Sequence, residues 1–391
     1  MEQLLQSWPS LVDSQERTRR LIDLCVVSVL LDAGAGNRWK YRSKESGKYY
    51  SRSEGLAVAS FEMFKSGFFS SDPAEPCVVD AAGLARVTVD RLAKALQVTE
   101  ENPLIGLQGR AELLNNLSTA LDNHPQFFEE ARPGSLVDYL LAHPSTVASS
   151  IPIVPITTLW TVLSDGFDCV WPQSRTQLDG VSLGDAWVCS DLNTGGKNKW
   201  ESIVPFHKPT QWLCYSIMVP MARMMNIYVS GSDLLTGLPE YRNGGLFIDT
   251  GLLNLKEADL NRGIGAYKVN ATVKGQPNVE VVPLFEMDDD VIAEWRAVTV
   301  GLLDDLLIEV NSQLGLNPED RLTLPQMLEA GTWKVCSEPS FPPCPRRILM
   351  NVSVCYRADV NWLPFQGPIP EYPRLWYILT EPSFDESYVI L

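Results

Sequence analysis

Histidine is scarce in this sequence, with three among 391 residues: His124, His143 and His207. They lie far apart, and none belongs to an H-x-x-x-H or H-E-x-x-H pattern, the spacings that put two metal ligands on one helix face. The eight cysteines form no C-x-x-C pair. We therefore expect no bound metal and no cofactor.

Other familiar signatures are missing as well. No G-x-S-x-G elbow marks a serine nucleophile. The stretch Gly34-Ala35-Gly36 lacks the third glycine of a dinucleotide fingerprint and follows a helical pattern rather than a strand. No uncharged apolar window reaches about 18 residues, so no membrane span is predicted. The N-terminus shows no secretory signal, and scattered cysteines are typical of reduced thiols, which together predict a cytoplasmic protein.

Positive charge is also in short supply. The chain has 48 acidic and 32 basic residues, a formal net charge of −16, and no long run of Lys or Arg. Nucleic acids are bound mainly through clusters of such cations, so we expect no nucleic-acid partner. A small anion held in a local basic pocket remains compatible with this charge. The oligomeric state stays open.

Hydrophobic residues make up 45% of the chain, enough for a large core. We predict a mainly α protein with a few short strands. Residues 1–334 form one domain, either undivided or made of two packed lobes of about 1–150 and 151–334. Two helices are predicted most clearly. One is capped by Asp13 or Ser14, has Gln15 and Glu16 in its first turn and runs to about Leu31, and the other runs from about Asp289 to Gln313. Strands are expected near Ile227–Val229 and Val279–Leu284.

The first chemically notable stretch is LLDAGAGNRWKY, residues 30–41. Asp32 follows an apolar helical run, so its carboxylate must be paired, hydrogen-bonded or shifted in pKa. One interpretation is a helix that ends at a glycine C-cap, with Asp32 bonded to loop amides. The other is a ligand site in which Trp39 and Tyr41 stack on a ring or sugar face, although aromatic side chains of this size more often lie in the core.

The second stretch is GLPEYRNGGLFID, residues 237–249, interpreted as a glycine-rich turn. Glu240 and Asp249 near Arg242 form either an ordinary salt-bridge cluster or a site in which one acid faces a ligand. Lys208 and Gln211 lie three residues apart and share a helix face, which is either a solvated first turn or part of the same site.

Five motifs, in order along the chain, carry a resemblance to a known family: LLDAGAGNRWKY, RSEGLAVASFEMF, FHKPTQWLCYS, GLPEYRNGGLFIDTG and EWRAVTVGLLDDLL. Over about Leu21 to Trp333 the sequence resembles the fungal and bacterial family called uracil catabolism protein 4, a family of unknown function associated with uracil breakdown. More remotely, three motifs resemble the queuosine salvage family of helical nucleoside hydrolases. That resemblance implies a DNA-glycosylase-like helical fold.

The remote resemblance also implies site residues. In that family an Asp in a leucine-rich segment precedes a Trp, a Lys-x-x-Gln helix lies mid-chain, and an Asp-Tyr-Arg motif carries the catalytic acid. Residue by residue, these fall on Asp32 and Trp39, Lys208 and Gln211, and Glu240, Tyr241 and Arg242. The acid of the last motif is Glu here instead of Asp, which changes its reach.

The resemblance breaks after Trp333. The family continues there as an Ala-Gly-Arg helix, whereas Lys334 is followed by VCSEPSFPPCPRRILMNVSVC, which has no periodicity. We expect residues 335–391 to be an irregular tail, and we hypothesise that a shifted reading frame or a misplaced splice site produced it. Transcript sequencing that confirms this frame across several strains would remove the hypothesis.

The resemblance implies a hydrolase of a ribosyl N-glycosidic bond in a ring-opened uridine nucleoside or nucleotide such as ribosylurea. Glu240 would be the catalytic acid, and Asp32 the second acid or a ligand of the ribose hydroxyls. The expected substrate-binding residues are Trp39, Tyr41, Lys208, Gln211, Tyr241, Arg242 and Asp249. Two alternatives stay open, namely a non-catalytic nucleotide sensor or scaffold protein of the same pathway, and an amidohydrolase that acts on the ureido group.

Overall fold

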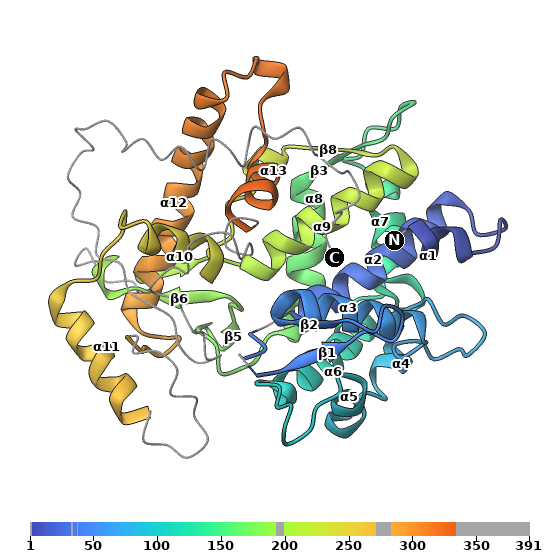
Figure 1. Ribbon diagram of the computed structural model, residues 1–391. Helices are drawn as coiled ribbons and strands as arrows, with labels where there is room; N and C mark the ends of the chain where they lie inside the picture. The colour runs from blue at the N-terminus through green and yellow to red at the C-terminus, as the bar shows by residue number, and fades with distance from the viewer. Residues whose placement is uncertain (1, 33, 37, 193–198, 271–282, 334–391) are drawn as a thin grey trace. The chain divides into compact units, whose positions relative to one another are not determined.

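The computed structural model describes residues 2–32, 34–36, 38–192, 199–270 and 283–333 (Figure 1). Within these residues the chain is mostly helical, and its strands form four two-stranded sheets. The prediction of a mainly α protein with a few short strands is confirmed. The likeness to DNA glycosylases stays a prediction, and the irregular tail expected over residues 335–391 lies outside the described residues.

The described chain divides into two compact units. Unit 1 comprises residues 2–185 and 209–235, and unit 2 comprises residues 186–208 and 236–333, with the gaps given above. The predicted arrangement of one domain with two possible lobes stays a prediction.

The helices of unit 1 and the helix that enters it from unit 2 are α1 (Glu2–Ser7), α2 (Ser14–Leu31), α3 (Arg52–Lys65), α4 (Ala81–Leu84), α5 (Val89–Ala95), α6 (Leu107–Asn123), α7 (Leu136–Ala142), α8 (Ile156–Gly166) and α9 (Lys208–Met225). The strands of unit 1 are β1 (Lys40–Arg42), β2 (Tyr49–Ser51), β3 (Ile153–Pro155), β4 (Gln177–Leu178), β5 (Val181–Ser182) and β8 (Tyr228–Ser230). The β3–β8 pair is parallel, and the pairs β1–β2 and β4–β5 are antiparallel. The predicted strand near Ile227–Val229 therefore corresponds to β8.

Helix α2 is the centre of unit 1. The Asp13 carboxylate accepts a hydrogen bond from the Glu16 backbone N–H at 2.8 Å, which caps the helix as the sequence predicts. From Leu21 to Leu31 every residue is buried. A helix segment that is buried all round is stable only inside a core, and α3, α6 and α7 pack against it.

One carboxylate on this buried helix is Asp23, whose exposed fraction is 0%. Its oxygens accept hydrogen bonds from Arg132 Nε at 2.7 Å and from the backbone N–H groups of Gly134 and Val79 at 2.7 and 3.3 Å. Burial nevertheless raises the pKa of Asp23 to about 6, against the attraction of Arg132. The Arg132 guanidinium also donates to both oxygens of Glu16 at 3.1 Å. Arg132 thus ties α2 to the loop that precedes α7.

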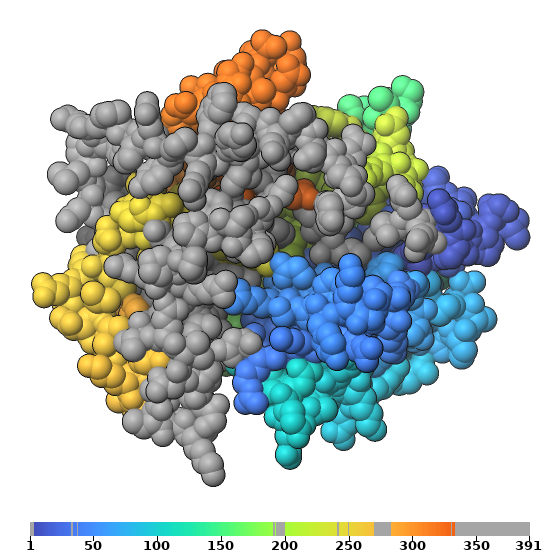
Figure 2. Space-filling view, in the orientation of Figure 1, coloured from blue at the N-terminus to red at the C-terminus, as the bar shows by residue number. Residues whose placement is uncertain are grey.

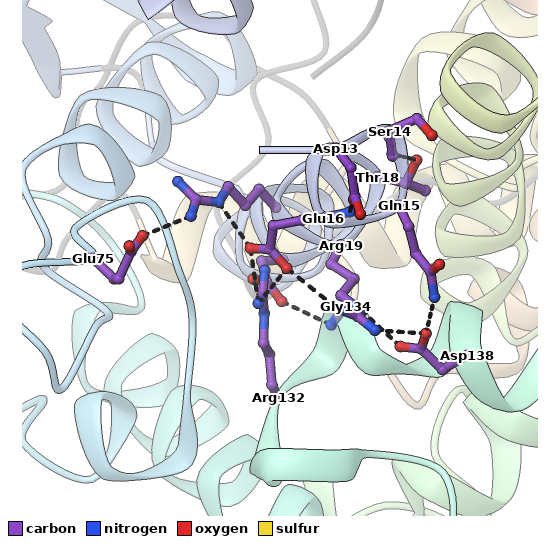
Figure 3. Close-up of polar contacts among 12 residues, drawn as sticks. Asp13, Ser14, Gln15, Glu16, Thr18, Arg19, Glu75, Arg132, Gly134 and Asp138 are labelled. Carbon is purple, nitrogen blue, oxygen red and sulfur yellow. Dashed lines mark hydrogen bonds and ion pairs between the residues drawn. The ribbon is translucent and has the colours of Figure 1, made fainter. Parts of the chain in front are cut away.

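The ion pairs extend along the same side of α2 (Figure 3). Glu16 also accepts from Arg20 at 2.8 Å, and Arg20 reaches Glu75 at 2.6 Å. Burial pushes the pKa of Glu16 upward, but the guanidinium groups of Arg132 and Arg20 hold that pKa below its ordinary value. The network replaces the water that these partly buried charges would otherwise need.

Strands β1 and β2 form a hairpin beside α3 (Figure 1). The outer edge of β1 is closed by two side-chain amides. Asn102 accepts from the Lys40 N–H at 2.8 Å and donates to its carbonyl at 2.9 Å, and Gln97 does the same for Arg42 at 3.0 and 2.9 Å. These amides take the place of a third strand, so the edge is protected against pairing with another chain.

Unit 2 contains β6 (Ala186–Val188), β7 (Ile203–Pro205), α10 (Tyr241–Asp249), α11 (Glu257–Asn270), α12 (Asp290–Gln313), α13 (Leu324–Met327) and a π-helical turn, Leu328–Trp333. Asp289 caps α12 and accepts from the Val291 N–H at 3.1 Å, so the long helix predicted from about Asp289 to Gln313 is confirmed. Of the strand predicted at Val279–Leu284, residues 279–282 lie outside the described residues, and 283–284 belong to no strand.

The interpretation of residues 237–249 as a glycine-rich turn is wrong, because Tyr241–Asp249 form α10. Each glycine weakens a helix interior by about 1 kcal/mol relative to alanine, which favoured a turn. Tertiary packing overrides that cost. A Cβ on Gly244 would lie 2.5 Å from the indole of Trp295, so this position must be glycine for α10 to approach α12. Trp295 Nε1 donates to the Gly244 carbonyl at 3.3 Å.

Candidate functional site

Asp32 ends helix α2 as its C-cap. Its backbone N–H donates to the carbonyls of Ser28 and Val29 at 3.0 and 3.2 Å, and the residue is half-buried. The helix therefore delivers this carboxylate at the edge of the core of unit 1, before the loop that contains Gly34 and Gly36.

Arg110 holds this loop in shape. From the buried face of α6, its Nε donates to the Leu31 carbonyl at 2.9 Å, its Nη2 to the Gly34 carbonyl at 3.2 Å, and its Nη1 to the Ile105 carbonyl at 2.5 Å. The side chain is 1% exposed, and burial lowers the pKa of Arg110 to about 10, whereas the negative charge of Asp32 acts in the opposite direction. Arg110 thus places a positive charge near Asp32 and holds the backbone of the loop that follows it.

The rings of Trp39 and Tyr41 lie in the core of unit 1, each 1% exposed. Trp39 Nε1 donates to the Leu96 carbonyl at 2.9 Å, and the Tyr41 hydroxyl donates to Glu62 at 2.9 Å. The core position that the sequence also allowed is therefore where both rings are found. Their assignment to a sugar-binding surface stays a prediction.

Glu240 is the N-cap of α10. Its Oε1 accepts a hydrogen bond from the Asn243 N–H at 3.1 Å, and its backbone is extended. Glutamate is not among the side chains preferred at this position, which are Ser, Thr, Asp and Asn. The positive end of the helix dipole faces the carboxylate.

Asn243 fixes the loop that carries this acid. It is fully buried, and its Nδ2 donates to the Leu238 carbonyl at 2.7 Å. Its Oδ1 accepts from the Thr332 hydroxyl at 2.6 Å, so the π-helical turn Leu328–Trp333 determines the orientation of the Asn243 amide. Because Asn243 also supplies the N–H that Glu240 accepts, one side chain connects the acid to two other segments.

Arg296, on α12, supports the same loop. Its Nε donates to the Pro239 carbonyl at 3.3 Å, and its guanidinium lies 4.2 Å from the centroid of Phe206. Both side chains are buried. The peptide before Glu240 is therefore held by a cation that stacks on an aromatic ring.

Burial and the neighbouring charges shift the pKa of Glu240 in opposite directions. Burial raises the pKa of the Glu240 carboxyl, and the nearby charges of Lys208 and Arg242 and the N–H groups of Arg242 and Asn243 lower it. The burial effect is the larger one, so the pKa lies above its ordinary value. A carboxyl in such a setting can gain or lose a proton nearer to neutral pH than an exposed one.

The structure brings together some of the predicted site residues. Glu240, Arg242 and Lys208, the first residue of α9, act on one another within unit 2. Gln211 is buried one turn further along α9, in unit 1. Asp32 also belongs to unit 1, so its meeting with Glu240 over one ligand stays a prediction. Tyr241 and Asp249 were also predicted to bind substrate, but their side chains lie outside what the structure describes.

In the described part of the chain, no group of three or more His, Cys, Asp or Glu side chains could hold a metal ion. The same residues contain no helix with the length and hydropathy of a membrane span.

Comparisons with known proteins agree on one family. The model of the family described as "Protein of unknown function (DUF1688)" matches residues 1–338. "Uracil catabolism protein 4" of Lachancea kluyveri is 44% identical over 344 residues, which is 86% of this chain and 76% of that protein. "Protein urg3" of Schizosaccharomyces pombe is 40% identical over 335 residues, which is 85% of this chain and 73% of that protein.

Proposed function

The chain belongs to the DUF1688 family of proteins of unknown function, and from this relationship we propose that it takes part in uracil catabolism as a hydrolase of a ribosyl N-glycosidic bond. The pathway is suggested by the name of the Lachancea kluyveri relative, "Uracil catabolism protein 4". The proposed substrate is a ring-opened uridine nucleoside or nucleotide of the ribosylurea type. Water adds to C1′ of the ribose, the C1′–N bond breaks, and the nitrogen takes up a proton to leave as urea or a ureido compound.

The observation that carries this proposal is the setting of Glu240. Breaking a C–N glycosidic bond builds positive charge on the ribose ring, which a fixed carboxylate stabilises. The Asn243 and Arg296 side chains hold the Glu240 loop in place. A carboxyl with a raised pKa also accepts a proton from the attacking water more readily than one with an ordinary pKa.

The two cations near Glu240 fit the remaining part of the substrate. Lys208 and Arg242 would bind a 5′-phosphate or the polarised ureido oxygen. Asp32, positioned by Arg110, would bind the ribose hydroxyls or act as the second acid.

The test compares the parent with Glu240→Gln and follows the release of free ribose and of urea from ribosylurea and from its 5′-phosphate. Removing a general acid–base group costs about 10²–10⁴-fold in rate, so we expect a loss in that range. Glu257→Gln, an exposed glutamate of the same unit, is the matched control and should retain full activity. Equal rates for Glu240→Gln and the parent would rule out the proposed role of this acid.

The products distinguish the other two function classes. An amidohydrolase would release ammonia and leave the ribosyl bond intact. A sensor or scaffold would bind the compound without turnover, and Glu240→Gln would then leave uracil breakdown in cells unchanged.

A further inference from the structure

The hairpin of β1 and β2 has a charge opposite to that of the chain as a whole. Residues 38–54 contain only two acids, Glu45 and Glu54, in a protein of net charge −16. Six cations on this segment are exposed, and none forms an ion pair with another described residue: Arg38, Lys40, Arg42, Lys44, Lys48 and Arg52. We call residues 38–52 the cationic hairpin.

The pairing of the strands orders these charges. In the register, Lys40 lies opposite Ser51 and Arg42 opposite Tyr49. Because side chains alternate along a strand, Lys40 and Arg42 point outward while Tyr41 between them points into the core. The ring of Tyr49 is 66% exposed, and the Arg42 guanidinium lies 5.8 Å from its centroid. The outer face therefore combines cations with one large apolar ring.

A partner of this face cannot pair with the outer edge of β1 as an added strand. The main-chain groups of Lys40 and Arg42 on the outer edge of β1 are already bonded to Asn102 and Gln97. An added strand would have to displace both amides, so an acidic side-chain surface is the better match.

The same chain presents such a surface on unit 2. Helix α12 exposes a row of residues at positions i, i+3, i+4, i+7 and i+11, which share one helix face. We call this row, Gly301, Asp304, Asp305, Ile308 and Ser312, the acidic stripe. In the described chain neither aspartate is in an ion pair, and Ile308 is 69% exposed. Burial and the neighbouring charge of Asp305 raise the pKa of Asp304, so a cation brought close to the pair would be stabilising. The end of α12 contributes to the orange surface at the top of Figure 2.

We propose that the cationic hairpin of one copy of this chain binds the acidic stripe of a second copy, with Tyr49 and Ile308 packed against each other inside a ring of charges. The charges are complementary, since unpaired cations meet unpaired carboxylates, and each surface carries one large exposed apolar side chain, Tyr49 on the hairpin and Ile308 on the stripe. The net charge of −16 favours attraction of a cationic hairpin and repels a nucleic-acid backbone. Because two different surfaces meet, the contact is head-to-tail, and it closes into a ring or continues as a chain.

Sedimentation velocity of the full chain over a range of concentrations tests this contact. We expect association in about 50 mM NaCl and dissociation in about 500 mM, because salt screens exposed charges. Lys40→Glu/Arg42→Glu and Asp304→Lys/Asp305→Lys should each sediment as monomers alone. An equimolar mixture should associate again, since the intact hairpin of the second variant meets the intact acidic stripe of the first, and the two reversed surfaces also have opposite charges.

Matched controls separate this contact from the effect of net charge. Lys94→Glu/Arg223→Glu and Glu100→Lys/Glu129→Lys change exposed residues elsewhere by the same charge and should associate like the parent. A parent that is monomeric at both salt concentrations would overturn the proposal. The proposal would also be overturned by control variants that associate as weakly as the hairpin and stripe variants. A mixture of the hairpin and stripe variants that does not associate would overturn it too. Salt-dependent binding of DNA or of an acidic peptide by a monomeric parent would assign the hairpin to another partner.

Discussion

Replacing Arg132 by methionine tests whether the buried ion network holds unit 1 together. The change removes the cation that bonds to Asp23 at 2.7 Å and to Glu16 at 3.1 Å, while a chain of similar length fills the space. Asp23 is 0% exposed, so its carboxylate would stay buried without a counter-ion. Breaking a buried pair in this way costs about 3–5 kcal/mol, a large part of the roughly 5–15 kcal/mol by which domains are stable.

The assay is urea unfolding followed by circular dichroism, with Arg19→Met as the control. Arg19 pairs with Asp138 at 2.7 Å, but its side chain is 29% exposed. Pairs of that kind contribute about 0–1 kcal/mol. We expect the free energy of unfolding to fall by at least three times as much for Arg132→Met as for Arg19→Met. Equal losses would refute the reasoning that burial makes the Arg132 pair different.

The pH dependence provides a second check on the same pair. The folded pKa of Asp23, about 6, exceeds its unfolded value of about 3.9. Its contribution to stability is therefore fully present below about pH 4 and is lost as the pH rises through 6. Without Arg132 the folded pKa rises further, at about 1.4 kcal/mol for each unit. The deficit of Arg132→Met relative to the parent should be larger at pH 8 than at pH 5, and a deficit independent of pH would contradict the assignment.

Three further changes have defined outcomes. Gly244→Ala forces a methyl group against Trp295 and should lower the melting temperature, with a cost of about 1–3 kcal/mol. Arg110→Met leaves three backbone carbonyls without a donor and should increase proteolysis within residues 31–36, as seen by mass spectrometry of the fragments. If Glu240 acts as the base, the activity should rise with pH through a pKa above 4.5, and Glu240→Gln should remove that part of the profile.

The sequence was most informative where one local pattern decides the structure. Helices α2 and α12 were predicted because each joins an acidic cap to a long apolar segment. Helix α10 was missed because two adjacent glycines indicate a turn. The close contact between Gly244 and the indole of Trp295 explains why a glycine is needed within this helix. The interaction that decided this element lies 51 residues away in the chain.

The candidate site divides in the same way. Glu240 and Asp32 were identified because acids beside glycines are visible in the sequence. The residues that hold their loops, Arg110, Asn243 and Arg296, were not, because their partners are mostly backbone carbonyls, which carry no sequence signal, and several of these are far away in the chain. A lone Arg in the apolar pattern of α6 was the one available signal. Trp39 and Tyr41 show the limit of composition, because large aromatic side chains suit a core and a binding surface equally well.

The bond between Thr332 and Asn243 sets an order of events during synthesis. The two residues are 89 positions apart, and a ribosome adds about 5–20 residues per second, so roughly 4 to 18 s separate their translation. Throughout that interval the nascent polypeptide already contains Glu240 but lacks the hydroxyl that orients the amide behind it. The Glu240 loop can therefore reach its final structure only after the π-helical turn Leu328–Trp333 has been synthesised.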